Sequence, residues 1–258
     1  MTDTTVTLTA PAKLTLSLRV TGVRADGLHL IDAEMVTLDL ADTLVLAEPV
    51  VPAAGYDSPG SYPAARTDES GHVVRFVGPF AEGLVVGEDL VTRALALAGV
   101  SAVVEVDKQI PSGAGLGGGS ADAGAILRWA GHTDVEAQAR LGADVPFCVV
   151  GGRARVTGIG EVLEPLPYEE RTFTLLTPPV HCATAAVYRT WDDLGGPTGE
   201  NGNDLEPAAL TVAPGLARWR DELSEAAGAV PMLAGSGSTW FVEGSFPGVG
   251  RRVVHTRP

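Results

Sequence analysis

Cysteine is scarce in this sequence, with only Cys148 and Cys182 among 258 residues. Two cysteines in so long a chain do not form the disulfide framework of a small secreted protein, and they make no CxxC pair for a metal. We therefore expect both to be small, buried, apolar side chains.

Long apolar runs are absent as well. No window approaches the roughly 18 uninterrupted apolar residues that a membrane-spanning helix needs. Residues 1–10 contain no basic stretch followed by an apolar one, which a secretory leader would show. These observations predict a cytoplasmic protein with no membrane partner.

Positive charge is in short supply. The chain has 18 lysine and arginine residues against 32 aspartate and glutamate residues, which gives a net charge of −14. Binding to a nucleic-acid backbone depends on clustered lysine and arginine, so nucleic-acid polymers are not expected as partners. Because 45% of the residues are apolar, the chain is expected to bury a substantial core rather than to be disordered.

Alternation of apolar and polar residues predicts a strand-rich beginning. Strands are expected over 6–10 and 14–20, broken at Pro11, and over 36–46 with a turn at Ala41 and Asp42. Residues 49–71 lack periodicity and are expected to form a long surface loop.

The remaining chain mixes predicted helices with predicted strands. Helices are expected over 88–98, 121–129, 185–193 and 214–227, and strands over 102–106, 153–156, 172–176 and 240–242. Because strands and helices do not alternate regularly, we expect an α+β fold rather than a doubly wound sheet. Two domains are expected, over residues 1–150 and 151–258.

Glycine is abundant, at 32 residues, and much of it is concentrated in the segment KQIPSGAGLGGGSADA, residues 108–123. A strand followed by glycines and then by a helix predicts an anion-binding loop, because backbone N–H groups and the helix dipole attract phosphate. Glycines also allow the backbone to approach a phosphate closely. A Walker P-loop is excluded because no lysine precedes Ser120.

The same segment also satisfies the dinucleotide pattern GxGxxG through Gly113, Gly115 and Gly118, which would indicate a dehydrogenase. That pattern needs an acidic residue at the end of a second parallel strand. Asp134 has about the right spacing, but it is expected in the first turn of a helix. The pattern alone is weak evidence.

The string PSGAGLGGGSADA resembles the second motif of the GHMP kinases. Two further segments agree with this family in order and spacing, PAKLTLSLRVTGVRADGLH near the start and MLAGSGST near the end. Shorter strings, LGADVPF, GxGE and NDLE, extend the resemblance over roughly residues 6–242 and are similar to the members that act in the non-mevalonate isoprenoid route. The resemblance implies a ribosomal-protein-S5-like N-terminal domain and a ferredoxin-like C-terminal domain, with the active site between them.

The resemblance also implies roles for particular residues. Asp144 corresponds to the catalytic aspartate and Lys13 to the lysine that pairs with it. Taken alone, Asp144 also fits a turn before a proline, and Lys13 fits a lysine that extends from an edge strand. Ser120 is expected to cap its helix, and the resemblance adds a contact with phosphate or Mg²⁺. The residues implied to bind ATP are Pro111, Ser112, Gly113, Ala114, Gly115, Leu116, Gly117, Gly118, Gly119 and Ser120.

A second group is implied to bind the substrate. His29 is expected to read the edge of a cytosine and Tyr188 to stack on the base, although an ordinary surface histidine or helix tyrosine would look the same. Thr15 and Leu28 depart from the family, which usually has Asn and Tyr there. A missing aromatic stack costs about 0.5–1.5 kcal/mol. The residues of this group are Thr15, Leu28, His29, Thr184, Tyr188, Gly235, Ser236 and Gly237.

As a whole, the resemblance implies a kinase that uses ATP and Mg²⁺ to phosphorylate the 2-hydroxyl of 4-diphosphocytidyl-2-C-methyl-D-erythritol. The departures at Thr15 and Leu28 leave open a GHMP kinase for another small alcohol. A non-catalytic nucleotide-binding relative also stays open, because the chain is short between Trp129 and Leu141 and lacks a final helix after Gly244. A monomer or a homodimer is expected.

Overall fold

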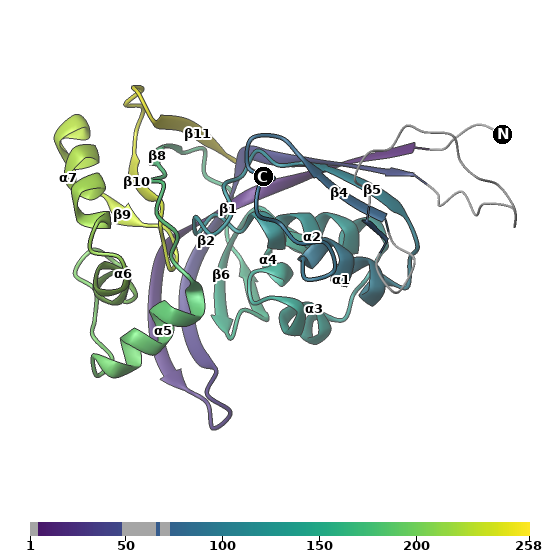
Figure 1. Cartoon of the computed structure of the whole chain (residues 1–258). Helices are drawn as coiled ribbons and strands as arrows, with labels where there is room; N and C mark the ends of the chain where they lie inside the picture. Colours follow the sequence, from purple (N-terminus) through teal and green to yellow (C-terminus); the bar gives the residue numbers. More distant parts are fainter. Residues whose placement is uncertain (1–4, 48–65, 68–72) are drawn as a thin grey trace, which may run out of the picture.

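The computed structural model describes residues 5–47, 66–67 and 73–258 (Figure 1). The surface loop expected over 49–71 lies outside these residues, apart from the short strand β3. In chain order the elements are β1 (Thr5–Val23), β2 (His29–Ala47), β3 (Arg66–Thr67), β4 (Val73–Val77), α1 (Leu90–Ala98), β5 (Val103–Asp107), α2 (Gly118–Trp129), α3 (Val135–Leu141), α4 (Val145–Val150), β6 (Arg153–Gly158), β7 (Val162–Pro165), β8 (Thr172–Leu176), α5 (Thr184–Asp193), α6 (Glu206–Val212), α7 (Leu216–Ala227), β9 (Met232–Leu233), β10 (Trp240–Glu243) and β11 (Arg251–Arg257).

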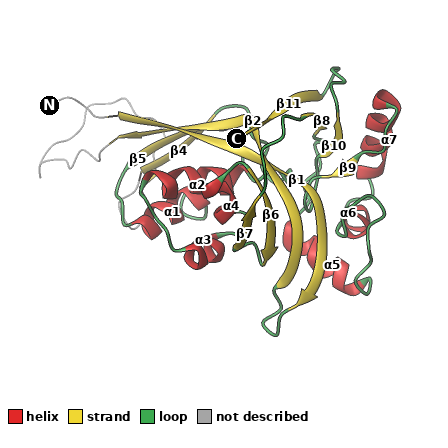
Figure 2. Cartoon of the chain, turned by 180° about the vertical axis from the view of Figure 1, so that it is seen from behind, coloured by secondary structure: helices red, strands yellow, loops and turns green. Residues whose placement is uncertain are grey.

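A long antiparallel hairpin of β1 and β2 runs through the molecule (Figure 2). Along its length β2 also pairs with β5, β6 and β11, and β5 pairs in parallel with β4. Strand β11 continues to β8, which pairs with β10, and β10 pairs with β9. One connected sheet therefore supports both ends of the molecule.

Helices cover this sheet in two groups. Helices α1, α2 and α4, with α3 beside them, lie on one face of β1, β2, β4 and β5 (Figures 1 and 2). Helices α5, α6 and α7 lie at the other end, beside β8, β9 and β10. The first group buries Leu38, Leu95 and Ile126, and the second packs around Trp240. Within the described ranges, no helix has the length and apolar character to cross a membrane.

Both expected breaks in the first strands are wrong. Strand β1 continues through Pro11 because a β-bulge follows that residue, and a bulge tolerates a proline. Strand β2 continues through Ala41 and Asp42, because the Asp42 side chain is buried and bonded to another segment instead of closing a turn. Two 19-residue strands thus replace four shorter ones.

Helix starts also differ from the expectation. Helix α1 begins at Leu90, and Asp89 caps it by accepting the Thr92 N–H at 2.7 Å. Helix α2 begins at Gly118 rather than at residue 121, so Ser120 lies inside its first turn and does not cap it. The cap position belongs to Gly117, which has a left-handed backbone and no side chain.

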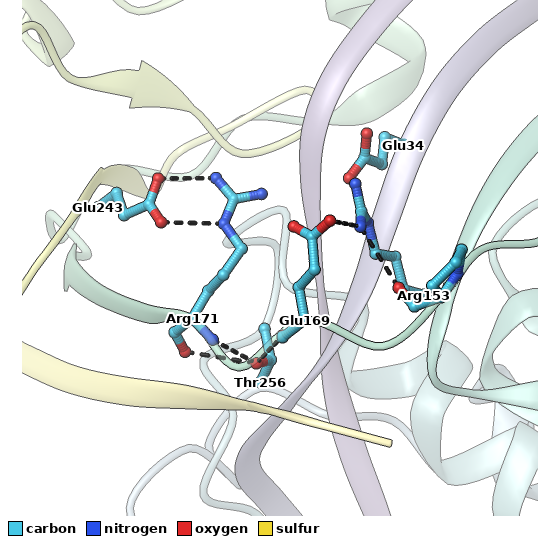
Figure 3. A network of polar contacts seen from close by, with 7 residues as sticks. Glu34, Arg153, Glu169, Arg171, Glu243 and Thr256 are labelled. Carbon is cyan, nitrogen blue, oxygen red and sulfur yellow. Dashed lines mark hydrogen bonds and ion pairs between the residues drawn. The ribbon is translucent and has the colours of Figure 1, made fainter.

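Ion pairs on the surface join neighbouring strands, and one of them links residues on the two sides of residue 150 (Figure 3). Arg153 of β6 pairs with Glu34 of β2 at 2.8 Å and with Glu169. Arg171, just before β8, holds Glu243 of β10 through two bonds of 3.0 and 2.8 Å. Each exposed pair contributes about 1 kcal/mol or less. The division into domains at residue 150 stays a prediction, and β6 and β7, which follow that residue, extend the sheet from β2.

A buried charged cluster lies where the glycine loop leaves the sheet. The ammonium of Lys108 bonds Asp42 of β2 and, at 2.5 Å, Asp122 of α2. The other oxygen of Asp42 accepts the N–H groups of Gln109 and Ile110 at 2.5 and 2.8 Å. All three charged residues are at most 2% exposed. The cluster therefore fixes β2, the start of the loop and the first turns of α2 relative to one another.

Two carboxyl groups share one ammonium in this cluster, and the pKa values of Asp122 and Lys108 are shifted there. Burial raises the pKa of Asp122 to about 8, against the opposing attraction of Lys108, and the nearby charge of Asp42 raises it further. Burial alone would lower the pKa of Lys108, but Asp122 and Asp42 raise it above its ordinary value. At neutral pH the cluster therefore holds a charged Lys108 and a mostly protonated Asp122.

Replacement of Lys108 by Met is expected to lower the free energy of unfolding by about 3–5 kcal/mol, because it leaves buried carboxylates without their cation. Chemical denaturation measures this change. The matched control is Arg155→Met, which breaks an exposed pair with Asp32 and is expected to cost about 1 kcal/mol or less. Equal losses in the two variants would contradict the structural role of Lys108.

Asp122 is also expected to make stability depend on pH. Its folded pKa of about 8 lies above the ordinary value of 3.8, so its contribution is complete below about pH 4 and is lost as the pH rises to about 8. Asp122→Asn removes this titration. The difference in unfolding free energy, variant minus wild type, should therefore increase between pH 5 and pH 8 and then level off. Denaturation curves at pH 5, 6.5 and 8 test this, and parallel profiles would refute it.

Candidate active site

Most of the predicted site residues line one cleft of about 890 Å³. The glycine loop, the middle of β1, the start of β2, the first turns of α5 and the turn after β9 form its walls. Leu116 and Gly237 are predicted site residues that do not line it. Leu116 instead lines a second hollow of about 580 Å³, which Pro111, Ser112 and Ala114 border as well.

The glycine loop is fixed by backbone hydrogen bonds from two other segments. The Lys13 N–H of β1 donates to Leu116 O, and the Thr239 N–H before β10 donates to Ala114 O, both at 3.1 Å. Glycine is required where these segments meet. A Cβ atom on Gly115 would lie 2.0 Å from Ala234 O, and φ at that residue is +78°. The three segments that resemble the family motifs thus meet around this loop.

The first turn of α2 opens into the cleft. Gly117 takes a left-handed conformation with φ of +69°, and the first helical N–H that finds a partner is that of Ala121, which donates to Gly117 O at 2.7 Å. The preceding residues Gly118, Gly119 and Ser120 all line the cleft. Free N–H groups at the positive end of a helix dipole form a site for anions such as phosphate.

The dinucleotide interpretation of the glycines does not fit this geometry. Asp134 caps α3, where its side chain accepts the Ala137 N–H at 2.9 Å, so it does not end a parallel strand. The strand before the loop, β5, pairs in parallel with β4 but antiparallel with β2. A doubly wound nucleotide-binding sheet is therefore not formed.

Lys13 and Asp144 come together beside the helix start, with the Lys13 Nζ 3.1 Å from Asp144 Oδ2. The same ammonium donates to the Thr15 hydroxyl at 3.0 Å. Lys13 is buried, so it does not extend from an edge strand into solvent. Asp144 precedes α4 but makes no capping bond with its side chain, which is 30% exposed and faces the cleft. A carboxylate placed in this way beside an ammonium is positioned to accept a proton from a hydroxyl in the cleft.

The turn after β9 is held by one buried amide. The Asn203 side chain donates to Leu233 O at 2.8 Å and to Gly235 O at 2.7 Å, and its oxygen accepts the Leu205 N–H at 2.9 Å. Ser236 of the same turn bonds Thr184 at the start of α5, with 2.9 Å between the hydroxyls. These bonds place the turn beside Lys13.

His29 and Tyr188, the residues expected to hold a base, also lie together. Their ring centroids are 4.6 Å apart and their planes are tilted by 37°. Burial raises the pKa of the Tyr188 hydroxyl, and the negative charge of Asp144 adds to this shift. Leu28 lines the cleft and is 45% exposed, so the wall has an aliphatic side chain at this point.

Several residues of the site were not predicted from the sequence. Lys108 also lines the cleft, and its Nζ lies under Gly118, 3.5 Å from where a Cβ would stand. Asp192 lines the cleft and bonds His29 at 2.9 Å. One signal could have indicated Lys108: the chain has only two lysines, and the other one is Lys13.

The side chains of this site do not assemble a metal centre of their own. No three His, Cys, Asp or Glu side chains meet in the described part of the chain in a way that could hold an ion. Ser120 contributes a single hydroxyl at the start of α2. The residues thus do not fit a metal ion held by the protein alone.

Comparison with known proteins agrees with this geometry. The family model "GHMP kinases N terminal domain" matches residues 85–152. A 4-diphosphocytidyl-2-C-methyl-D-erythritol kinase from Paracoccus denitrificans is 36% identical over 252 residues, which cover 90% of this chain and 84% of the relative. An enzyme of the same name from Cereibacter sphaeroides is 36% identical over 261 residues, covering 90% of this chain and 87% of the relative.

A solved structure is similar over nearly the whole chain. The crystal structure of a 4-(cytidine 5'-diphospho)-2C-methyl-D-erythritol kinase superposes with a TM-score of 0.70 and 26% identity, covering 97% of this chain and 99% of the other. This confirms the expected α+β kinase fold. The chain belongs to the GHMP kinase family, alongside relatives named 4-diphosphocytidyl-2-C-methyl-D-erythritol kinases.

Proposed function

We propose that this chain transfers the γ-phosphoryl group of ATP to the 2-hydroxyl of 4-diphosphocytidyl-2-C-methyl-D-erythritol, in isoprenoid precursor biosynthesis. The observation that carries the proposal is the ion pair of Lys13 and Asp144, 3.1 Å apart, in the cleft that the N-terminus of α2 lines. The named relatives share the chain's full architecture, which supports the same activity.

The phosphates of ATP are bound in this proposal by the loop of residues 111–120. N–H groups at the start of α2 face the phosphate oxygens, and the buried cluster around Lys108 keeps this helix start in place. Donors that are already oriented stabilise charge in the transition state without reorganising. Lys13 adds a positive charge near the transferred group.

Proton removal is assigned to Asp144. The acceptor hydroxyl oxygen attacks the γ-phosphorus, the bond from that phosphorus to the bridging oxygen breaks, and ADP leaves with the bonding electrons. The hydroxyl proton passes to Asp144, which later releases it to water. Lys13 holds the carboxylate in place through its contacts with Asp144 and Thr15.

The cytidyl group is assigned to the region of Leu28, His29 and Tyr188. Asn203 and Ser236 hold the turn at Gly235 beside the acceptor.

Mg²⁺ is proposed only as a companion of the ATP phosphates with Ser120 nearby, and the assigned proton transfer does not depend on it. The proposal places the enzyme in the cytoplasm, where ATP is available, and a monomer or homodimer stays a prediction.

Two alternatives from the sequence receive different support. A non-catalytic nucleotide-binding protein needs neither Lys13 nor Asp144, and here the two are paired, which argues against it. A GHMP kinase for another small alcohol is the second candidate, because Leu28 replaces an aromatic wall of the base site.

Asp144→Asn is expected to lower kcat by about 10²–10⁴-fold, because the amide cannot take the hydroxyl proton. Release of ADP with ATP and 4-diphosphocytidyl-2-C-methyl-D-erythritol measures turnover, and circular dichroism checks the fold. Asp221→Asn, at an exposed helix position, is the matched control and should keep full activity. Unchanged turnover in Asp144→Asn would remove Asp144 from the mechanism, and no ADP from the wild type would refute the proposed function.

Leu28→Tyr is expected to lower the KM for the cytidyl substrate by about twofold to tenfold, because a ring restores stacking worth about 0.5–1.5 kcal/mol. The KM for ATP should not change. Val162→Tyr, at an exposed position of β7 outside the cleft, is the control. The second candidate would be favoured by two results together: an unchanged KM for the cytidyl substrate in Leu28→Tyr, and a wild type that phosphorylates mevalonate, homoserine or a sugar faster than the cytidyl substrate.

A further inference from the structure

His29 is enclosed by one face of helix α5. Its side chain is only 11% exposed. The Tyr188 ring lies 4.6 Å from its ring, and the Trp191 ring meets it edge-on at 5.7 Å with an interplanar angle of 82°. The Trp191 indole is itself fixed, because its N–H donates to Pro197 O at 2.9 Å. The imidazole therefore has a defined position in the cleft.

The helix also determines which nitrogen of His29 carries hydrogen. The Nε2 atom lies 2.9 Å from Oδ1 of Asp192. A carboxylate oxygen accepts hydrogen bonds, so this contact assigns the hydrogen to Nε2. In a neutral imidazole with hydrogen on Nε2, the Nδ1 atom is an acceptor. No hydrogen bond engages Nδ1 among the residues that the structure describes, although His29 lines the cleft.

An acceptor at this place distinguishes two kinds of pyrimidine. Cytosine carries an amino group at position 4, which donates, whereas uracil carries a carbonyl oxygen, which accepts. An acceptor that faces an acceptor loses the hydrogen bond and leaves two polar groups unpaired, which is costly inside a cleft. Stacking on a side chain distinguishes cytosine from uracil poorly, because the faces of the two rings are similar. Leu28 adds no polar group that could distinguish them.

We propose that Asp192 is a specificity-determining positioning residue, which fixes His29 with its Nδ1 lone pair toward the base and so selects a 4-amino pyrimidine over a 4-oxo pyrimidine. The inference rests on the proposed function, because it takes the base of the substrate to lie against His29. Asp192 does not touch the reacting atoms and acts through His29. Its side chain is 46% exposed, so its replacement should not disturb the core.

The test compares the binding of CDP and UDP by calorimetry in the wild type, Asp192→Asn and Asp193→Asn. An Asn side chain can present either its oxygen or its NH₂ group to Nε2, so it no longer fixes the tautomer. We expect the wild type to prefer CDP by about tenfold or more, a difference typical of one discriminating hydrogen bond. Asp192→Asn should reduce this ratio to about threefold or less. Asp193→Asn, on the same helix but outside the cleft, should keep the wild-type ratio.

Two further measurements separate positioning from a general structural effect. Long-range proton–nitrogen NMR should find hydrogen on Nε2 of His29 in the wild type and a mixture of tautomers in Asp192→Asn. In a His29→Ala background, Asp192→Asn should not change the ratio further, because its effect passes through the imidazole. The KM for ATP should be the same in all variants.

The results have distinct consequences. An unchanged ratio in Asp192→Asn, or hydrogen on Nδ1 in the wild type, would overturn the role of Asp192 even if the enzyme phosphorylates its cytidyl substrate normally. A wild type that neither binds CDP nor releases ADP with that substrate would overturn the proposed function, and the specificity inference with it. A CDP preference that is lost in Asp192→Asn and kept in Asp193→Asn would support the role of Asp192, and release of ADP with the cytidyl substrate would support the proposed function.

Discussion

The buried contacts of the Lys108 ammonium with the carboxyl groups of Asp42 and Asp122 fix the start of the glycine loop relative to β2 and α2. Lys108 cannot move away from Asp42 and Asp122 without leaving unpaired charge in the interior, which is strongly unfavourable. Because Asp42 belongs to β2 and Asp122 to α2, the helix start has one position relative to the sheet. The N–H groups that face the cleft are therefore oriented before any anion arrives, which is the condition for effective electrostatic stabilisation.

Lys13 connects this loop to the reacting end of the cleft. Its backbone N–H bonds Leu116 O in the loop, and its ammonium bonds Asp144 and Thr15. A displacement of the loop would thus displace the ion pair of Lys13 and Asp144 as well. Gly117 must lack a side chain for the same reason, since a Cβ there would lie 2.8 Å from Lys13 Cγ. The proposed phosphate binding and the proposed proton transfer therefore depend on one arrangement of β1 and the loop.

The parts of the site that were predictable from sequence are those whose chemistry is local. The strand, glycines and helix around residues 108–129 predict an anion site by themselves, and Asp144 and Lys13 stand in recognisable strings. The predictions that were wrong or missing concern residues whose partners lie far away in the chain. Asp42 was expected in a turn because its partner Lys108 lies 66 residues on, and Asp192 was not considered because His29 lies 163 residues before it. The periodicity of a sequence indicates which face of a helix or strand is apolar. It does not indicate which distant polar side chain a given residue contacts in the folded protein.

The distribution of cations explains how so acidic a chain can bind an anionic nucleotide. With a net charge of −14, the surface as a whole repels phosphate. Of the 18 basic residues, 16 are arginine, and several of these are paired on the surface with carboxylates, as Arg153 and Arg171 are. The two lysines are both buried at the cleft, but they are paired with carboxyl groups as well, so the free N–H groups at the start of α2 add the attraction for phosphate there. Attraction for phosphate is therefore confined to the cleft, while the acidic exterior disfavours polyanions that are too large to enter it.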